Sequence, residues 1–159
     1  MNWLKNLLRV TDEKEDNMND LLLLMLADYG LSEVPGIHSN PKIIEFFSEL
    51  GYDVDDDSMT AWCSAALSYY AKQCGLEYNK TLVARDWLQV PTKVVTPDIG
   101  DIAVLWRGSP QSWKGHVGLF ISQDVHNLYL LGGNQNNSIS IAPYDRDRLL
   151  GYRKLRKIT

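Results

Sequence analysis

The residue pattern changes at Gly100, and this change constrains the fold more than any other feature of the chain. Before Gly100, apolar residues recur at helical spacing. After it come short runs rich in β-favouring residues and separated by turn residues, at 101–106, 116–122, 127–132, 138–144 and 149–155. Helices followed by strands predict an α+β domain, with N-terminal helices packed on a mainly antiparallel C-terminal sheet.

Start and stop signals predict helices over about residues 18–29, 41–51, 59–74 and 81–88. The second is the clearest, because Asn40 can cap it, Pro41 suits its first position and Gly51 can end it. The apolar run at 21–26 is too short to span a bilayer and is predicted to be a buried helix.

A chain of 159 residues fits one domain, which we place at residues 18–159. Residues 1–17 are predicted to be an N-terminal helix and linker. The amphipathic part at 2–10 fits a packed helix better than a membrane-surface helix. This segment has no secretory signal pattern. We therefore expect synthesis in the cytoplasm, and action in the periplasm or cell wall would require another delivery route.

The net charge of −4 argues against a nucleic-acid partner, which would normally select a basic patch or stripe. It also argues against unaided adhesion to an anionic cell wall. No stretch is long enough for stable membrane insertion.

The two cysteines, Cys63 and Cys74, fall in one predicted helix, eleven residues apart. At 1.5 Å per residue they would be separated by about 16 Å, whereas a disulfide needs Cα atoms within about 7 Å. A disulfide between them is therefore excluded if the helix forms. Cys74 is predicted to be a small buried apolar residue. Cys63 lies in the first helical turn, where unpaired N–H groups and the helix dipole can stabilise a thiolate, so it is either a core thiol or a nucleophile.

A nucleophilic cysteine needs a base, and His116 is the strongest candidate among the three histidines. It opens a predicted strand between Gly115 and Val117, which would place its imidazole at a sheet edge with little bulk around it. A structural or capping role is the alternative. His38 and His126 fall in predicted loops and carry no such context.

The Asn-rich segment at 134–137 follows Gly132 and Gly133 at the end of another predicted strand. A side-chain carbonyl oxygen from this segment could accept the second imidazole N–H and fix its tautomer. A simple hairpin turn is the alternative. No spacing typical of a metal site, phosphate loop or dinucleotide fold is present, so we expect no metal and no cofactor.

Four stretches, in this order, resemble the papain-like cell-wall cysteine hydrolases of the NlpC and CHAP type: TAWCSAALSYY, GDIAVLW, GHVGLFI and LLGGNQNNSISI. The nearest likeness is to a small bacterial and phage subfamily with Trp-Cys, His-Val-Gly and Gly-Gly-Asn-Gln motifs, and it covers roughly residues 20–155. The resemblance implies a papain-like fold with the nucleophile at the start of a helix packed on the sheet.

By motif, the resemblance makes Cys63 the nucleophile, His116 the general base and Asn134 the orienting residue. Gln135 and Asn136 are the alternatives to Asn134 as the orienting residue. If they do not have that role, they are expected to contact the substrate. Trp62 and Trp113 are expected to line the substrate groove, Trp113 from the loop before His116. The chain lacks the Asp-Cys-Ser of the NlpC branch and the glutamate of CHAP enzymes.

The function implied is hydrolysis of an amide bond in peptidoglycan, in the stem peptide or at the sugar–peptide junction. Such an enzyme could be a phage lysin or an injected antibacterial amidase with an immunity protein as partner. An amide transferase or deamidase, or an inactive binding module, are the alternative functions for the same fold.

Overall fold

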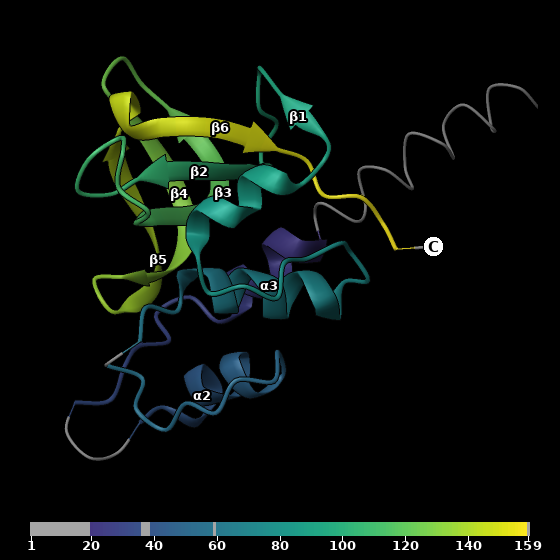
Figure 1. Ribbon diagram of the computed structural model, residues 1–159, viewed down its shortest axis with the longest axis vertical. Coiled ribbons are helices and arrows are strands. Elements are labelled where there is room, and N and C mark those ends of the chain that lie inside the picture. Colours follow the sequence, from purple (N-terminus) through teal and green to yellow (C-terminus); the bar gives the residue numbers. More distant parts are fainter. Residues whose placement is uncertain (1–19, 36–38, 59, 159) are drawn as a thin grey trace, which may run out of the picture.

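The computed structural model describes residues 20–35, 39–58 and 60–158. Residues 20–27 are helical, and two further helices and a 3₁₀ helix precede the sheet: α2 (Pro41–Ser48), α3 (Cys63–Gln73) and η1 (Ala84–Gln89). In Figure 1, α3 lies between the sheet and α2. Helix α3 is buried along most of its length because it packs on both layers.

Six strands form one antiparallel sheet: β1 (Lys93–Val94), β2 (Ile102–Trp106), β3 (Gly115–Gln123), β4 (Asn127–Gln135), β5 (Ser138–Asp145) and β6 (Leu149–Arg153). A short 3₁₀ helix, η2 (Arg146–Arg148), joins the last two. The strand order is β1-β6-β2-β3-β4-β5, and all neighbouring strands run antiparallel. This confirms the predicted α+β fold with helices before the sheet.

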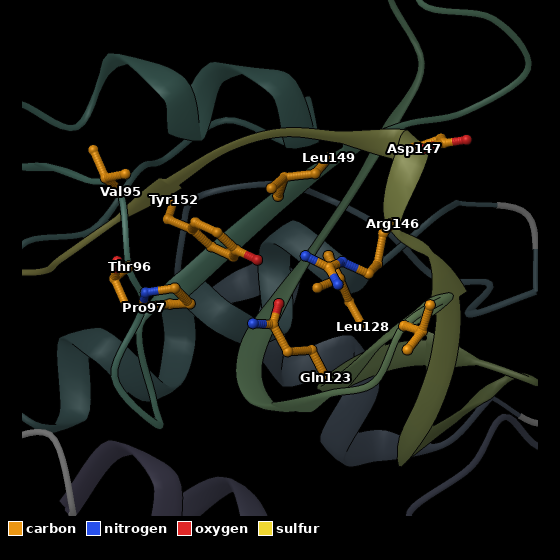
Figure 2. Close-up of a pocket in the computed structure, with 10 residues that line it drawn as sticks. Val95, Thr96, Pro97, Gln123, Leu128, Arg146, Asp147, Leu149 and Tyr152 are labelled. Carbon is orange, nitrogen blue, oxygen red and sulfur yellow. The ribbon is translucent and has the colours of Figure 1, made fainter.

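The two faces of the sheet bury different apolar clusters, as the period of two along a strand requires. On β2, Ile102 and Val104 pack toward the helices, whereas Ala103 and Leu105 belong to a second cluster. Val95, just after β1, and Arg146, just after β5, come from opposite ends of the strand order and yet line one hollow (Figure 2). The sheet is therefore curled into an open barrel around the second cluster.

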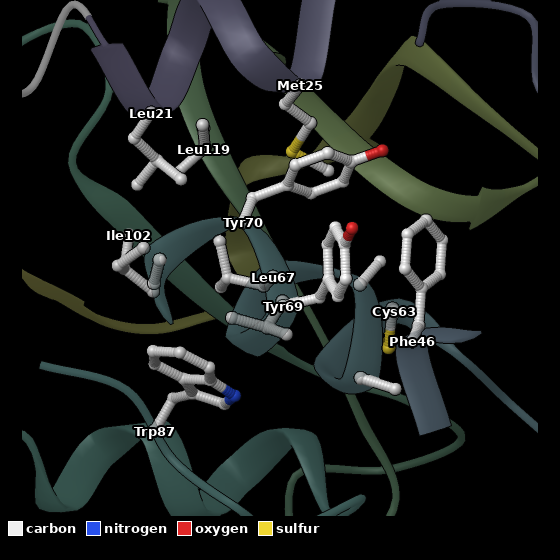
Figure 3. Packing of buried hydrophobic residues seen from close by; sticks show 14 of the residues in the cluster. Leu21, Met25, Phe46, Cys63, Leu67, Tyr69, Tyr70, Trp87, Ile102 and Leu119 are labelled. Atoms are coloured by element: carbon white, nitrogen blue, oxygen red, sulfur yellow. The ribbon is translucent and has the colours of Figure 1, made fainter. Parts of the chain in front are cut away.

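The core between helices and sheet gathers large side chains from each of the helices that precede the sheet (Figure 3). The helix at 20–27 contributes Leu21 and Met25, which are four residues apart and fully buried. Leu23 and Leu24 are 61% and 41% exposed, so the apolar run expected to be a buried helix is buried on one side only. A helix packed at the periphery of the fold has only one face available for burial.

The start of α2 is held by local side-chain bonds, as the sequence predicts. Asn40 Oδ1 accepts the backbone N–H of Lys42 at 3.0 Å, and Pro41 occupies the first turn. Asp57, from the acidic loop before α3, is buried, and its Oδ2 accepts the backbone N–H of Asn40 at 2.7 Å. This buried carboxylate therefore fixes the entry to α2.

Helix α3 begins at Cys63, and Cys74 is its C-cap residue. Both cysteines are free, which confirms that no disulfide joins them.

The segment predicted as helical at 81–88 is the 3₁₀ helix η1. The predictions for residues 1–17 and for His38 lie outside the described residues. Over the part of the chain that the structure describes, no helix has both the length and the apolar character needed to cross a membrane.

Candidate active site

Cys63 is the first residue of α3 and lies 6% exposed where this helix meets β3. Its N-cap residue, Trp62, makes no side-chain capping bond. The thiol is reached by the backbone N–H of Val117, the residue next to His116, and by that of Ser64. The fold thus places the sulfur within reach of donors from both the helix start and the histidine strand.

Burial raises the pKa of the Cys63 thiol above its usual value. The backbone N–H of Val117 and, more weakly, the positive charge of Arg107 act in the opposite direction without overcoming this effect. The helix N-terminus alone would predict a thiolate, but desolvation disfavours the charged form more strongly. Cys63 is therefore a protonated thiol at neutral pH in this structure.

His116 opposes Leu105 of β2, one residue from the start of β3. Because β3 lies between β2 and β4, the imidazole is inside the sheet and 7% exposed, not at the sheet edge that we expected. The pKa of His116 is lowered to about 4, mainly by burial and to a lesser extent by Arg148 and Arg107, against the opposing bond from Gln135. The imidazole is consequently neutral at pH 7 and can accept a proton.

Gln135 provides the hydrogen-bond partner of this imidazole. Its Oε1 lies 2.9 Å from Nε2 of His116, while its Nε2 donates to the carbonyl oxygens of Leu130 at 3.1 Å and Ser140 at 2.6 Å. Carbonyl oxygens only accept, so the amide nitrogen must face them and Oε1 must face the imidazole. Neutral His116 therefore carries its proton on Nε2, which leaves Nδ1 as the basic nitrogen.

A break in the β4–β5 register turns Gln135 toward the histidine. Gly132 pairs with Ser140, but the next recorded pair is Gln135 with Ser138. Asn134, within this irregularity, has a left-handed φ of 55° and makes no side-chain hydrogen bond among those of the described residues. The predicted orienting position is thus occupied by Gln135, one of the two alternatives to Asn134.

Gly132 and Gly133 provide the space that this arrangement needs. A Cβ atom on Gly132 would lie 2.6 Å from Oε1 of Gln135 and 3.4 Å from Nε2 of His116. A Cβ atom on Gly133 would lie 2.7 Å from the ring of Trp62. The first glycine therefore admits the pair of hydrogen-bonded side chains, and the second admits the aromatic residue that precedes Cys63.

Tyr144, on β5, packs on the imidazole of His116 and is within electrostatic range of Cys63. Its ring stacks on the imidazole of His116, with centroids 4.8 Å apart and an interplanar angle of 26°. Burial raises the pKa of Tyr144, and the negative charge that Cys63 would carry as a thiolate adds to this effect. The tyrosine therefore stays protonated and is close to both the thiol and the base.

Two guanidinium groups complete this side of the site. Arg148 lies over the rings of Trp106 and Tyr144, 5.8 Å and 5.4 Å from their centroids, and its Nε donates to the carbonyl oxygen of Trp106 at 3.0 Å. Neither Arg148 nor Arg107 forms an ion pair within the described part of the chain. The positive charges of both arginines lower the pKa of His116, and the charge of Arg107 also acts to lower the pKa of Cys63.

The other residues predicted to contact substrate, Trp62, Trp113 and Asn136, lie in three different parts of the structure. Trp62 is fully buried, packs 6.1 Å from the Phe46 ring and donates from Nε1 to Glu33 at 2.9 Å. Trp62 is therefore a core residue, and the prediction that it lines the substrate groove is wrong. Its ring fills the space left by the missing side chain of Gly133. Trp113 is 70% exposed on the loop before His116. Asn136 is exposed in the β4–β5 turn, where it and Asn137 both have positive φ.

Sequence reasoning missed Tyr144, Arg148 and Arg107, which come from a strand, a 3₁₀ helix and a loop without a local motif. Within residues 20–35, 39–58 and 60–158, no group of three or more His, Cys, Asp or Glu side chains is placed to hold a metal ion. The arrangement offers a thiol, a neutral base with a fixed tautomer and backbone donors, which are the groups needed for nucleophilic attack on a carbonyl.

The fold is that of P60 domains. The chain superposes on the P60 domain of an antigen from M. avium subspecies paratuberculosis with a TM-score of 0.53 and 11% identity, covering 91% of this chain and 96% of that one. It also matches a lipoprotein-like NLP/P60 family protein from Staphylococcus aureus with a TM-score of 0.52 and 16% identity, covering 87% of this chain.

The chain spans only 41% of the length of the S. aureus protein. No family model matches the sequence, and no curated protein is similar to it at a significant level. At these identities the likeness is one of fold, so the role of each side chain has to come from the site itself.

Proposed function

We propose that this protein is a cysteine-dependent hydrolase of amide bonds in peptidoglycan. The observation that carries the proposal is the buried pair of His116 and Gln135, in which the amide of Gln135 leaves Nδ1 of the imidazole free to act as a base. The buried thiol of Cys63 is reached by the backbone N–H of Val117, the residue that follows His116. The occurrence of these groups on a fold shared with P60 domains supports the cell wall as the source of the substrate.

In the proposed reaction the resting pair is neutral, because burial disfavours both the thiolate and the imidazolium. Nδ1 of His116 takes the proton from Sγ of Cys63 as the sulfur attacks the carbonyl carbon of the amide. The proposed donors to the developing oxyanion are the backbone N–H of Cys63 and the hydroxyl of Tyr144, which stays protonated.

The tetrahedral intermediate then collapses with cleavage of the C–N bond. The leaving amine takes the proton from Nδ1, and a thioester to Cys63 remains. Water attacks this thioester with His116 as the base, which releases the carboxylic acid and restores the thiol. Gln135 holds the same imidazole edge throughout, and it acts through His116 as a positioning residue. Trp113, exposed three residues before His116, is the proposed contact for substrate outside the catalytic set.

The direct test is to incubate purified peptidoglycan with the wild-type protein, Cys63→Ala and Cys74→Ala, and to analyse released fragments by mass spectrometry. We expect cleavage by the wild type and Cys74→Ala, and none by Cys63→Ala. Cleavage that survives in Cys63→Ala would refute the role of the nucleophile. If folded wild type releases nothing, the amide transferase and the inactive binding module become the better explanations. The masses of the fragments distinguish the stem-peptide bonds from the sugar–peptide amide.

The proposed site of action is the periplasm or cell wall, reached as a phage lysin or an injected effector that an immunity protein would neutralise. Expression in a Gram-negative host with and without an added secretion signal tests this. We expect lysis only when the wild-type protein is directed to the periplasm, with Cys63→Ala in the same compartment harmless. Lysis from the cytoplasm would contradict the proposed location.

A further inference from the structure

The hollow inside the curled sheet (Figure 2) has a lining that includes neither Cys63 nor His116. It has a volume of about 470 Å³, within the range of pockets that hold small ligands. Gln123, the last residue of β3, and Leu128, near the start of β4, line it. His116 is seven residues back along β3, a separation of roughly 23 Å at 3.3 Å per residue. One end of the hollow therefore lies far from His116, whereas Leu149, which also lines it, pairs with Leu105, the residue that opposes His116.

Polar atoms make up most of the exposed lining of this hollow, and its apolar side chains lie at the rim and beneath it. Val95 and Val125 at the rim are 94% and 81% exposed, whereas Leu128 is buried. Leu128, Leu149 and Tyr152 belong to the cluster inside the curled sheet. The exposed valines at the rim offer surface that an apolar group of a ligand would remove from water.

Three polar groups point toward the centre of the hollow: the guanidinium of Arg146, the amide of Gln123 and the hydroxyl of Tyr152 (Figure 2). Nη1 of Arg146 donates to the carbonyl oxygen of Asp124 at 2.9 Å, which anchors this side chain while its other N–H groups stay available. In the described part of the chain, no hydrogen bond uses the Gln123 amide or the Tyr152 hydroxyl.

The charge at the centre of the hollow is positive. Burial raises the pKa of Tyr152, and the nearby charge of Arg146 opposes this rise, so the guanidinium is close to the phenol. Asp147 is the only acidic residue that lines the hollow among the described residues, and its carboxylate points away from the centre (Figure 2). A guanidinium beside a hydroxyl donor is suited to a carboxylate.

We propose that this hollow binds the C-terminal end of a peptide, with the terminal carboxylate on Arg146 and Tyr152. The Gln123 amide, which has both a donor and an acceptor, matches the last peptide group, and the exposed valines at the rim contact a small apolar side chain. The site is independent of Cys63, so it adds a recognition site to whatever reaction the first site performs.

The test uses the full-length Cys63→Ala protein, so that hydrolysis cannot remove the probe. N-acetyl-alanyl-leucine is titrated into isotope-labelled protein and followed by the backbone amide resonances in two-dimensional NMR. We expect saturable shifts that centre on Gln123, Leu128 and Arg146. The same dipeptide with a C-terminal amide lacks the charge and is expected to bind at least tenfold more weakly. Equal binding of the two dipeptides, or no binding at millimolar concentration, would overturn the proposal.

Arg146→Gln is expected to weaken binding of the acid at least tenfold. Arg156→Gln, at an exposed arginine paired with Glu77, is the matched control and should bind normally. Gln123→Leu changes an exposed position that makes no internal side-chain bond and should weaken binding severalfold. It serves as the second test if Arg146→Gln fails to fold. Octanoate distinguishes a free acid from a peptide end, and octanoate binding as tightly as the dipeptide would overturn the assignment to peptides.

Discussion

Nε2 of His116 and Oε1 of Gln135 lie 2.9 Å apart in a buried setting, and two backbone carbonyls determine which end of the glutamine amide faces the ring. One side chain thereby fixes both the orientation and the tautomer of the base. The chemistry of the site therefore depends on a neutral glutamine, without a carboxylate partner for the imidazole.

Replacing Gln135 tests its role against that of Asn134. Gln135→Ala removes the bond that fixes the tautomer, and we expect kcat to fall by roughly 100-fold, within the range for general-base catalysis. Asn134→Gly keeps the left-handed backbone and should retain activity within about threefold. Peptidoglycan turnover under saturating substrate measures both. Equal losses in the two variants would contradict the assignment to Gln135.

The acidic limb of the pH–rate profile is the second prediction. Because the pKa of His116 is lowered to about 4, kcat/KM should rise as pH increases through about 4 and change little near 6.5. Arg148 lowers the pKa of this imidazole, so Arg148→Gln should move the limb to higher pH. Arg156→Gln is the control and should leave it in place. A wild-type limb near 6.5 would show that the imidazole is not desolvated.

Stability should also depend on pH through His116. Between pH 6.5 and about 4 the unfolded imidazole binds a proton that the folded one does not, so the free energy of unfolding falls as pH drops. The full effect of a shift of this size is about 3 kcal/mol. His116→Gln should lose this part of the slope in denaturant titrations at several pH values. Parallel curves for wild type and variant over this range would contradict the lowered pKa.

Alanine substitutions at the two glycines of β4, Gly132 and Gly133, should have different effects on activity and stability. Gly133→Ala places a methyl group against the Trp62 ring, and overpacking of this kind typically costs about 1–3 kcal/mol, which would appear as a lower Tm. Gly132→Ala meets Oε1 of Gln135, so activity should fall more than the loss of Tm explains. Thermal unfolding and turnover on the same samples separate the two effects. Full activity in folded Gly132→Ala would contradict the required spacing.

The sequence predicted the elements whose signals are local. Cys63 at a helix start and His116 at the start of a strand follow from capping residues and short-range patterns, and both occur where expected. Gln135 was harder to select, because an irregularity in the β4–β5 pairing decides which residue of the Asn-rich segment turns inward. Alternation along a regular strand contains no information about such a register shift.

Burial was the other property that local patterns could not provide. Trp62 was expected in a groove, and the imidazole of His116 at an exposed edge, but strand order and the packing of α3 bury both. The same packing raises the pKa of Cys63 although the helix start favours a thiolate, since desolvation depends on neighbours that are distant in the chain. Tyr144 and Arg148 reach the site only because the sheet curls.

The indole of Trp62 acts as a spacer between two parts of the site. It immediately precedes Cys63, and its ring rests on Gly133, two residues before Gln135. The gap between the nucleophile-bearing helix and the strand that orients the base is therefore set by the thickness of one aromatic ring. Ring size at position 62 offers a means to adjust the reach between sulfur and imidazole without altering any reacting group.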